Sequence, residues 1–186
     1  MDEKESKTEL LRGSLTREEL LGRYVDVPKY LGYCAECPHF GEFWSCPPYD
    51  FDPMDVWNGY DRLDILAMRI YPEGEGEKAL AAADPETFLL PYGAELTRML
   101  VEWERQEPGS LRLNPGRCKL CTRCARIEGN PCRHREDMRW SIESLGGAVG
   151  DIARDVLRSP LCWGQAGQAP AYFLLVGGLL RREETC

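Results

Sequence analysis

The sequence lacks a long apolar run and an excess of positive charge. Its longest apolar run, residues 171–180, has ten residues, whereas a membrane-spanning helix needs about 20. There are 23 Lys and Arg residues against 31 Asp and Glu residues, which leaves a net charge of −8. These two absences argue against a membrane protein and against a protein that binds nucleic acid or anionic lipid through its overall charge.

A secretory signal is also missing. The first ten residues are mostly charged and polar, where a signal peptide would place an apolar stretch. We therefore expect a cytoplasmic protein. In a reducing cytosol the nine cysteines are not expected to form disulfides, and an odd number could not all pair within one chain. Metal or redox chemistry becomes the leading interpretation of these cysteines.

Common catalytic motifs are absent as well. The chain has no P-loop, no GxGxxG run, and no C-x3-C-x2-C run of the kind that radical S-adenosylmethionine enzymes use. With only two histidines, His39 and His134, no Ser-His-Asp arrangement can be assigned. The sequence therefore leaves open whether the protein is an enzyme.

Local signals predict an α+β fold. Residues 16–19 form a capping box, and Asp52-Pro53 and Asp84-Pro85 each start a helix, the second of which contains Pro91. The apolar segments 63–71 and 172–180 predict strands, the second of them central in its sheet, and residues 110–113 predict a short one.

We expect a single-domain sandwich of a small mixed sheet and helices, with two cysteine-rich metal-binding loops. The charged residues 1–11 predict a disordered or frayed tail, and residues 12–186 a single metal-binding domain. Residues 73–77 predict a solvated linker or turn, while residues 78–83, 141–145 and 149–157 have a helical pattern.

The strongest signal lies in residues 118–132, hereafter the second cysteine loop. Cys118, Cys121 and Cys124 form a C-x2-C-x2-C run, which favours three corners of a 4Fe-4S cluster, and Cys132 could supply the fourth ligand. Ferredoxin runs place the last cysteine after three residues, whereas seven intervene here. Zinc and reduced structural thiols remain alternatives.

Three further cysteines lie in residues 33–49, hereafter the first cysteine loop. Cys34, Cys37 and Cys46 could hold three irons of a second cluster and leave one iron for Cys162, His39, water or a substrate. Alternatively, they form a zinc site with His39 or Cys162. His39 and His134 could each ligate a metal or donate a hydrogen bond to a thiolate.

Both loops resemble one known family. The motifs are Cys34-x-x-Cys37, Trp44-Ser-Cys46-Pro-Pro-Tyr49, Cys118-x-Leu-Cys121-x-x-Cys124, Pro131-Cys132-Arg-His134 and Ser141-x-Glu143-x-Leu-Gly146. Together, from about Tyr24 onward, they are similar to a family of predicted metal-binding proteins, the domain of unknown function 2284. The resemblance implies no known reaction. It implies that the shared metal ligands are Cys34, Cys37, Cys46, Cys118, Cys121, Cys124 and Cys132, with Cys162 and Cys186 outside the shared pattern.

Charge is unevenly distributed around the second cysteine loop. Residues 112–139 contain eight basic side chains against three acidic ones, although the whole chain is acidic. These cations could favour the reduced form of a nearby cluster, could form a solvated face, or could dock an acidic redox partner or a phosphorylated substrate. Ser141 and Glu143 most simply start a helix.

The sequence as a whole predicts a cytoplasmic iron-sulfur protein with a redox or electron-transfer role. One alternative is an enzyme that binds a small substrate at an open iron held by the three cysteines of the first cysteine loop. Another is a zinc-stabilised interaction module. A redox partner protein is expected, but no nucleic acid or membrane partner, and the oligomeric state stays open.

Overall fold

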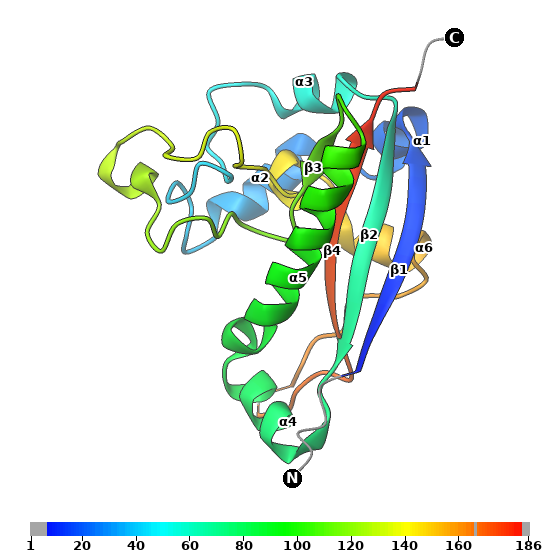
Figure 1. Cartoon of the computed structure of the whole chain (residues 1–186), viewed down its shortest axis with the longest axis vertical. Coiled ribbons are helices and arrows are strands. Elements are labelled where there is room, and N and C mark those ends of the chain that lie inside the picture. Colours follow the sequence, from blue (N-terminus) through cyan, green and yellow to red (C-terminus); the bar gives the residue numbers. More distant parts are fainter. Residues whose placement is uncertain (1–6, 166, 184–186) are drawn as a thin grey trace.

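Four strands form one antiparallel sheet in the computed structural model, which describes residues 7–165 and 167–183 (Figure 1). The strand order is β1-β2-β4-β3, and each of the three pairings between these strands is antiparallel. The last strand in the sequence therefore lies inside the sheet, as its apolar composition predicted. The strands are β1 (Lys7–Thr16), β2 (Arg62–Tyr71), β3 (Leu111–Leu113) and β4 (Phe173–Arg181).

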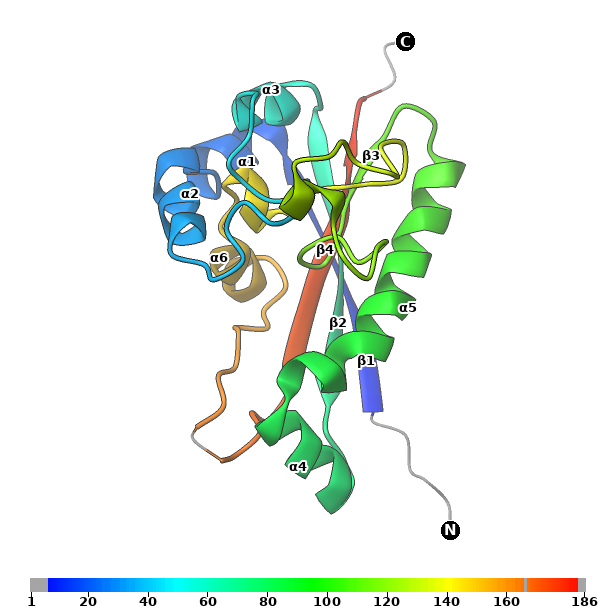
Figure 2. The same ribbon diagram turned by 90° about the vertical axis from the view of Figure 1, so that its left-hand side faces the viewer.

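Helices cover both faces of the sheet (Figure 2). The short helices α1 (Arg17–Arg23), α2 (Val27–Ala35), α3 (Pro53–Asn58) and α6 (Val149–Asp155) lie on one side. On the other side lie α4 (Gly74–Ala83) and the long helix α5 (Pro85–Gln106). Two single 3-10 turns, η1 (Ala125–Glu128) and η2 (Glu143–Leu145), belong to the connections.

The alternation of side chains along β2 explains why both faces are covered. Leu63, Ile65 and Ala67 belong to the core cluster that includes α1, α3 and α6. Leu66 and Met68, which alternate with them along the strand, join the second cluster, under α4 and α5. Successive side chains of a strand point to opposite faces, so an apolar strand needs a layer on each side.

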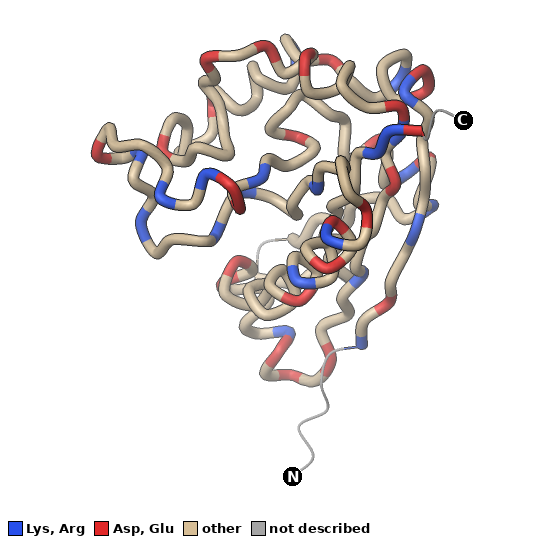
Figure 3. The backbone as a smooth tube through the Cα atoms, turned by 45° about the horizontal axis from the view of Figure 1, so that its top comes forward, with Lys and Arg blue, Asp and Glu red and all other residues tan. Residues whose placement is uncertain are grey.

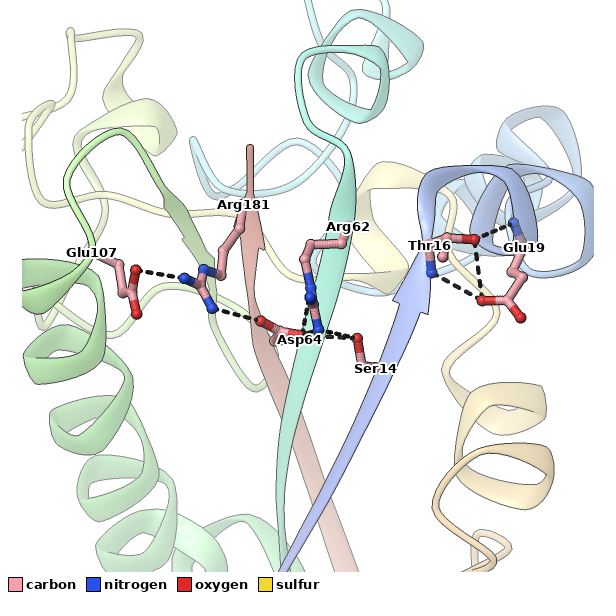
Figure 4. A network of polar contacts seen from close by, with 7 residues as sticks. All are labelled: Ser14, Thr16, Glu19, Arg62, Asp64, Glu107 and Arg181. Atoms are coloured by element: carbon pink, nitrogen blue, oxygen red, sulfur yellow. Dashed lines mark hydrogen bonds and ion pairs between the residues drawn. The ribbon is translucent and has the colours of Figure 1, made fainter. Parts of the chain in front are cut away.

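Most of the predicted elements are confirmed, including the α+β class and the capping box. The Thr16 hydroxyl accepts a hydrogen bond from the Glu19 backbone N–H at 3.2 Å, and the Glu19 carboxylate accepts one from the Thr16 backbone N–H at 3.0 Å (Figure 4). Asp52 and Asp84 cap α3 and α5 as predicted, and Pro91 lies inside α5.

Three local predictions were wrong. Residues 7–11 belong to β1, where the sequence predicted a tail, because ten residues of β1 pair with β2 and the sheet supplies their hydrogen bonds. Residues 1–6 of that predicted tail lie outside the described residues. Residues 74–77 form the first turn of α4 rather than a linker, and the sheet is antiparallel at each described pairing rather than mixed.

A polar network joins the ends of three strands and α5 (Figure 4). The Asp64 carboxylate accepts hydrogen bonds from Ser14 at 2.8 Å, from Arg62 at 2.7 Å and from Arg181 at 3.2 Å. Burial opposes the ionisation of Asp64, but these three donors outweigh it and hold the pKa below its ordinary value. Arg181 also pairs with Glu107, just beyond the C-terminal end of α5.

None of the helices in the described residues combines the length and the apolar character that a membrane span requires.

Candidate metal centre

The four cysteines of the second cysteine loop line one small cavity of about 20 Å³. Each of them is half-exposed and has a free thiol. The cavity is closed on its other sides by Phe43, Trp44 and Ser45 of the first cysteine loop, and by Leu120, His134 and Met138. The predicted set Cys118, Cys121, Cys124 and Cys132 is therefore brought together by the fold.

Hydrogen bonds shape this cavity. The backbone N–H of His134 donates to the sulfur of Cys132 at 3.4 Å, and the backbone N–H of Cys118 donates to the Ser45 hydroxyl at 2.9 Å. Burial raises the pKa of the Cys118 thiol, and the neighbouring thiols Cys132, Cys121 and Cys124 raise it further.

Glu104 of α5 ties both flanks of the second cysteine loop to the sheet. Its carboxylate accepts a hydrogen bond from Arg112 at 2.5 Å, before the loop, and one from Arg139 at 2.7 Å, after the loop. The backbone N–H of Asn114 also donates to the carbonyl of Trp140 at 2.8 Å. The two ends of the loop are thus held next to each other.

The cysteines of the first cysteine loop also lie near one another. Cys34 is at the C-terminal end of α2, Cys37 is exposed, and Cys46 is half-buried. Burial and, to a lesser extent, the charges of Cys34, Glu143 and Cys37 together raise the pKa of Cys46 to about 11. Burial also raises the pKa of Cys34. These thiols therefore hold their protons at neutral pH, and metal binding has to release them.

A close backbone approach at Gly146 places α2. Gly146 has a φ of +91°, and a Cβ atom on it would lie 2.7 Å from the Cα of Val27, the first residue of α2. The backbone N–H of Asp26 donates to the Gly146 carbonyl at 3.0 Å. A glycine is needed here because its backbone takes positive φ without strain and leaves room for the helix. The contact brings η2, with Glu143, up to the first cysteine loop.

The two cysteine loops interlock through Arg126. Its guanidinium donates to the carbonyl oxygens of Phe43 at 2.8 Å and of Cys46 at 2.6 Å, and it also donates to that of Pro48. The same guanidinium lies over the Trp44 ring, 4.9 Å from its centroid. A residue of the second cysteine loop therefore holds the backbone of the first.

Sequence reasoning missed the position of Glu143. It was assigned to a helix start, but burial raises the pKa of its carboxyl, and its charge acts on the thiols of Cys34 and Cys46. The Ser141 hydroxyl accepts a hydrogen bond from the backbone N–H of Ser144 at 3.2 Å, but the N-cap residue of η2 is Ile142, so the predicted capping role of Ser141 was wrong. The motif Ser141-x-Glu143 could have indicated a carboxylate near the cysteines only if the contact between η2 and α2 had been known.

The histidines and the remaining cysteines take separate places. The Nδ1 atom of His39 lies 2.6 Å from the carboxylate of Glu42, whereas His134 borders the cysteine cavity. Cys162 lines a different cavity, of about 560 Å³, together with Glu143. Cys186 lies outside the described residues.

Figure 3 marks the basic and acidic residues along the chain, and several of the basic residues around the second cysteine loop have acidic partners. Arg112 and Arg139 bind Glu104, Arg117 binds Glu86, and the Arg123 side chain lies 3.8 Å from Glu128. The guanidinium of Arg126 donates hydrogen bonds to backbone carbonyls. The excess of basic residues in the sequence is therefore in large part structural, because these residues fasten the loop.

The donor set suits a metal that prefers sulfur. Among the described residues, no three His, Cys, Asp or Glu side chains are gathered closely enough to hold one metal ion in this structure. The four cysteines of the second cysteine loop nevertheless line one cavity, and thiolate sulfur is the ligand type of zinc and iron-sulfur sites. The ligand loops have to close further on a single ion, as metal-coupled local folding allows.

Comparison with known proteins now adds a family. A family model described as "Predicted metal-binding protein (DUF2284)" matches residues 26–179. The chain belongs to the DUF2284 family. The match spans both cysteine loops, so the resemblance that the cysteine motifs indicated is confirmed, whereas β1 and α1 precede it. The curated proteins and the solved structures contain no significant match to this chain. The family supports metal binding for the DUF2284 chain and leaves the metal to be determined.

Proposed function

We propose that this DUF2284 protein is an iron-sulfur protein with a redox or electron-transfer role. The observation that carries the proposal is the convergence of the four thiols of the second cysteine loop on one cavity. A 4Fe-4S cluster would be held there by Cys118, Cys121, Cys124 and Cys132. When bound, such a cluster accepts and donates single electrons.

The spacing of the ligands favours a cluster over zinc. In a C-x2-C-x2-C run three thiolates follow one another at intervals of three residues, so that each can bind a different iron of one cluster. Structural zinc sites more often use two separated C-x2-C pairs around one ion. The zinc-stabilised interaction module is therefore the second interpretation, and the metal analysis below separates the two.

Residues around the cavity can adjust the properties of a bound cluster. Phe43, Leu120 and Met138 present apolar atoms that limit the access of water. The backbone N–H of His134 donates to the Cys132 sulfur, and a hydrogen bond to a ligand sulfur stabilises negative charge on it. Both features act on the reduction potential of an iron-sulfur centre.

The first cysteine loop is the proposed place of a second metal centre. Cys34, Cys37 and Cys46 would be its ligands, with iron or zinc as the metal. Glu143 belongs to η2, which packs against the helix α2 that carries Cys34, so its carboxyl is the proposed further ligand for a metal that lacks a fourth protein ligand. The alternative to an electron carrier is an enzyme, in which one iron of this centre binds a small molecule. Either role agrees with one metal-binding domain that includes β1 from Lys7 onward, working in the cytoplasm with a redox partner protein.

The test is a measurement of iron, zinc and acid-labile sulfide per chain on protein purified without oxygen, together with its visible absorption spectrum. We expect about four irons and four sulfides for the second cysteine loop alone, and about eight of each if both loops hold clusters. Zinc without sulfide would overturn the redox proposal in favour of the zinc module. An electron carrier should in addition show reversible one-electron reduction.

Three matched variants assign the metal to its loop. Cys121→Ser should remove about four irons, whereas Cys46→Ser should remove only the metal of the first cysteine loop. Cys162→Ser is the control, because Cys162 borders another cavity. Full metal content in Cys121→Ser would contradict the proposed ligand set.

A further inference from the structure

A groove runs between α5 and the chain that leads into the second cysteine loop. It has a volume of about 910 Å³ and is lined by α5 on one side and by residues 114–120 on the other. Figure 2 shows α5 alongside this part of the chain. The size is in the range of sites that hold small organic molecules, about 300–1,000 Å³.

The α5 side of the groove is kept open by small residues at helix positions. Gly93 lies inside α5, where a glycine costs about 1 kcal/mol relative to alanine. A Cβ atom at this position would meet only a methyl group of Leu175, at the ordinary distance of 3.9 Å. Close packing therefore does not require the glycine, and together with Ala94 it leaves the floor of the groove free.

The rim of the groove is cationic although the protein is acidic. Apart from Arg112, which Glu104 neutralises, the charged lining residues are Arg98, Arg117, Lys119 and Glu86. Glu86 pairs with Arg117 and lies 4.0 Å from Lys119. The exposed guanidinium of Arg98 has no hydrogen bond or ion pair with any residue that the structure describes. Three cations against one carboxylate favour an anionic group in the ligand.

The groove adjoins the candidate metal centre. Leu120, between Cys118 and Cys121, lines both the groove and the cysteine cavity. Its side chain is 45% exposed, and that of Leu90 on α5 is 44% exposed, so apolar surface is available on both walls. An apolar molecule in the groove would therefore lie against the same leucine that borders the cysteine thiols.

We propose that the groove binds a small organic anion with an apolar body, such as an aromatic or aliphatic carboxylate or sulfonate. The apolar body covers Leu90, Ala94 and Leu120, and the anionic group pairs with Arg98. This site is distinct from the cysteine ligands, and it does not depend on which metal the second cysteine loop holds.

The test uses 8-anilinonaphthalene-1-sulfonate, an aromatic sulfonate whose fluorescence rises on binding, with the purified metal-loaded protein. We expect saturable binding of one probe per chain. Gly93→Leu should weaken it about tenfold by filling the groove, and a leucine suits the helix interior better than a glycine. Arg98→Gln should weaken it about fivefold by removing the cation.

Two controls distinguish binding at this site from non-specific binding of the probe. Arg105→Gln lies on the same helix outside the groove lining and should bind like the unchanged protein. The uncharged probe N-phenyl-1-naphthylamine should be insensitive to Arg98→Gln but not to Gly93→Leu. Circular dichroism confirms that each variant is folded.

Equal probe binding in Gly93→Leu and in the unchanged protein would overturn the proposal, and so would the absence of saturable binding. Equal loss in Arg98→Gln and Arg105→Gln would show a non-specific charge effect and would contradict the assigned role of Arg98. Metal and sulfide are measured on the same samples, so a failure of the iron-sulfur proposal is seen separately from a failure of this one.

Discussion

The first and second cysteine loops differ in what holds them in place. Glu104 and a backbone hydrogen bond between residues 114 and 140 attach the flanks of the second loop to α5 and to each other. The first loop begins at the end of α2, and its middle is held by Arg126, a residue of the second loop. The order of the first loop therefore depends on the second, while the second depends on the α5 side of the sheet.

This dependence has a consequence for metal binding. A metal site is as rigid as the backbone that carries its ligands, and ligands on a loop need support from outside the loop. We expect damage to the attachment of the second loop to affect both centres. Loss of the Arg126 hydrogen bonds between the loops should affect the first centre alone.

The largest effect is expected from Glu104→Gln. The Arg112 side chain is only 5% exposed, and loss of the carboxylate leaves its charge buried with no negative charge to neutralise it, although Asn114 and the Asp137 carbonyl still accept hydrogen bonds from it. Breaking such a pair should lower the free energy of unfolding by about 3 kcal/mol, as measured by urea unfolding. The metal content of both loops should fall with it.

Glu102→Gln is the control, because Glu102 is an exposed residue of the same helix that accepts a hydrogen bond from Gln106. It should change stability by less than about 0.5 kcal/mol. If Glu104→Gln behaves like this control, Glu104 is not what attaches the second loop.

Arg126→Gln should uncouple the two loops. The glutamine cannot reach the three carbonyls that the guanidinium binds, and the loss should be about 2 kcal/mol because these hydrogen bonds come from a charged donor. In metal-free protein we expect faster alkylation of Cys46 by iodoacetamide, with little change at Cys118, as followed by mass spectrometry. The matched control is Arg123→Gln, since the side chain of Arg123 is 65% exposed. Equal acceleration at both cysteines would contradict the order of dependence.

Asp64→Asn tests whether the sheet can lose stability without affecting either loop. The pKa of Asp64 is lowered from an ordinary 3.8, so its stabilising effect is complete above that value and is lost as the pH falls through the lower folded pKa. The variant should be about 1 to 2 kcal/mol less stable at neutral pH and should lose less stability below pH 3.8 than the unchanged protein. Urea unfolding at a series of pH values measures both. A drop in the metal content of either loop would show that the network reaches the metal centres.

The smallest effect is expected from Ser45→Ala. The hydroxyl of this buried serine accepts the hydrogen bond from the backbone N–H of Cys118, and its loss should cost about 1 kcal/mol. We expect faster loss of metal to a chelator from the second loop. Thr122→Ala, at an exposed position of that loop, is the control. Unchanged metal release in Ser45→Ala would show that the first loop does not support the second through this contact.

Local features of the fold were predictable because neighbouring residues decide them. The capping box at Thr16, the cap at Asp52 and the proline starts of helices depend on groups a few residues apart. The pairing of residues 7–11 was not predictable in this way. Those charged residues become a strand because β2 offers them an edge, with partners about 60 residues away.

In the candidate site, too, the features set by neighbouring residues were predictable and those that depend on distant residues were not. The cysteine spacing pointed to the ligand sets, and the family match covers both loops. The basic residues of the segment 112–139 were expected to tune a cluster, to form a solvated face or to dock a partner, yet Arg112, Arg126 and Arg139 fasten the loops. The role of such residues depends on partners that the sequence does not place next to them.

By itself, the sequence determined the ligand chemistry, the helix starts and the two apolar strands, because spacing, capping and alternation are properties of short segments. Only the tertiary structure decided that Glu104 closes the second loop, that Arg126 holds the first, and that a cationic groove lies beside the thiols. Each of these features joins segments far apart in the chain. Their energies come from burial and charge pairing, which arise only when the sheet and its two helical layers have assembled.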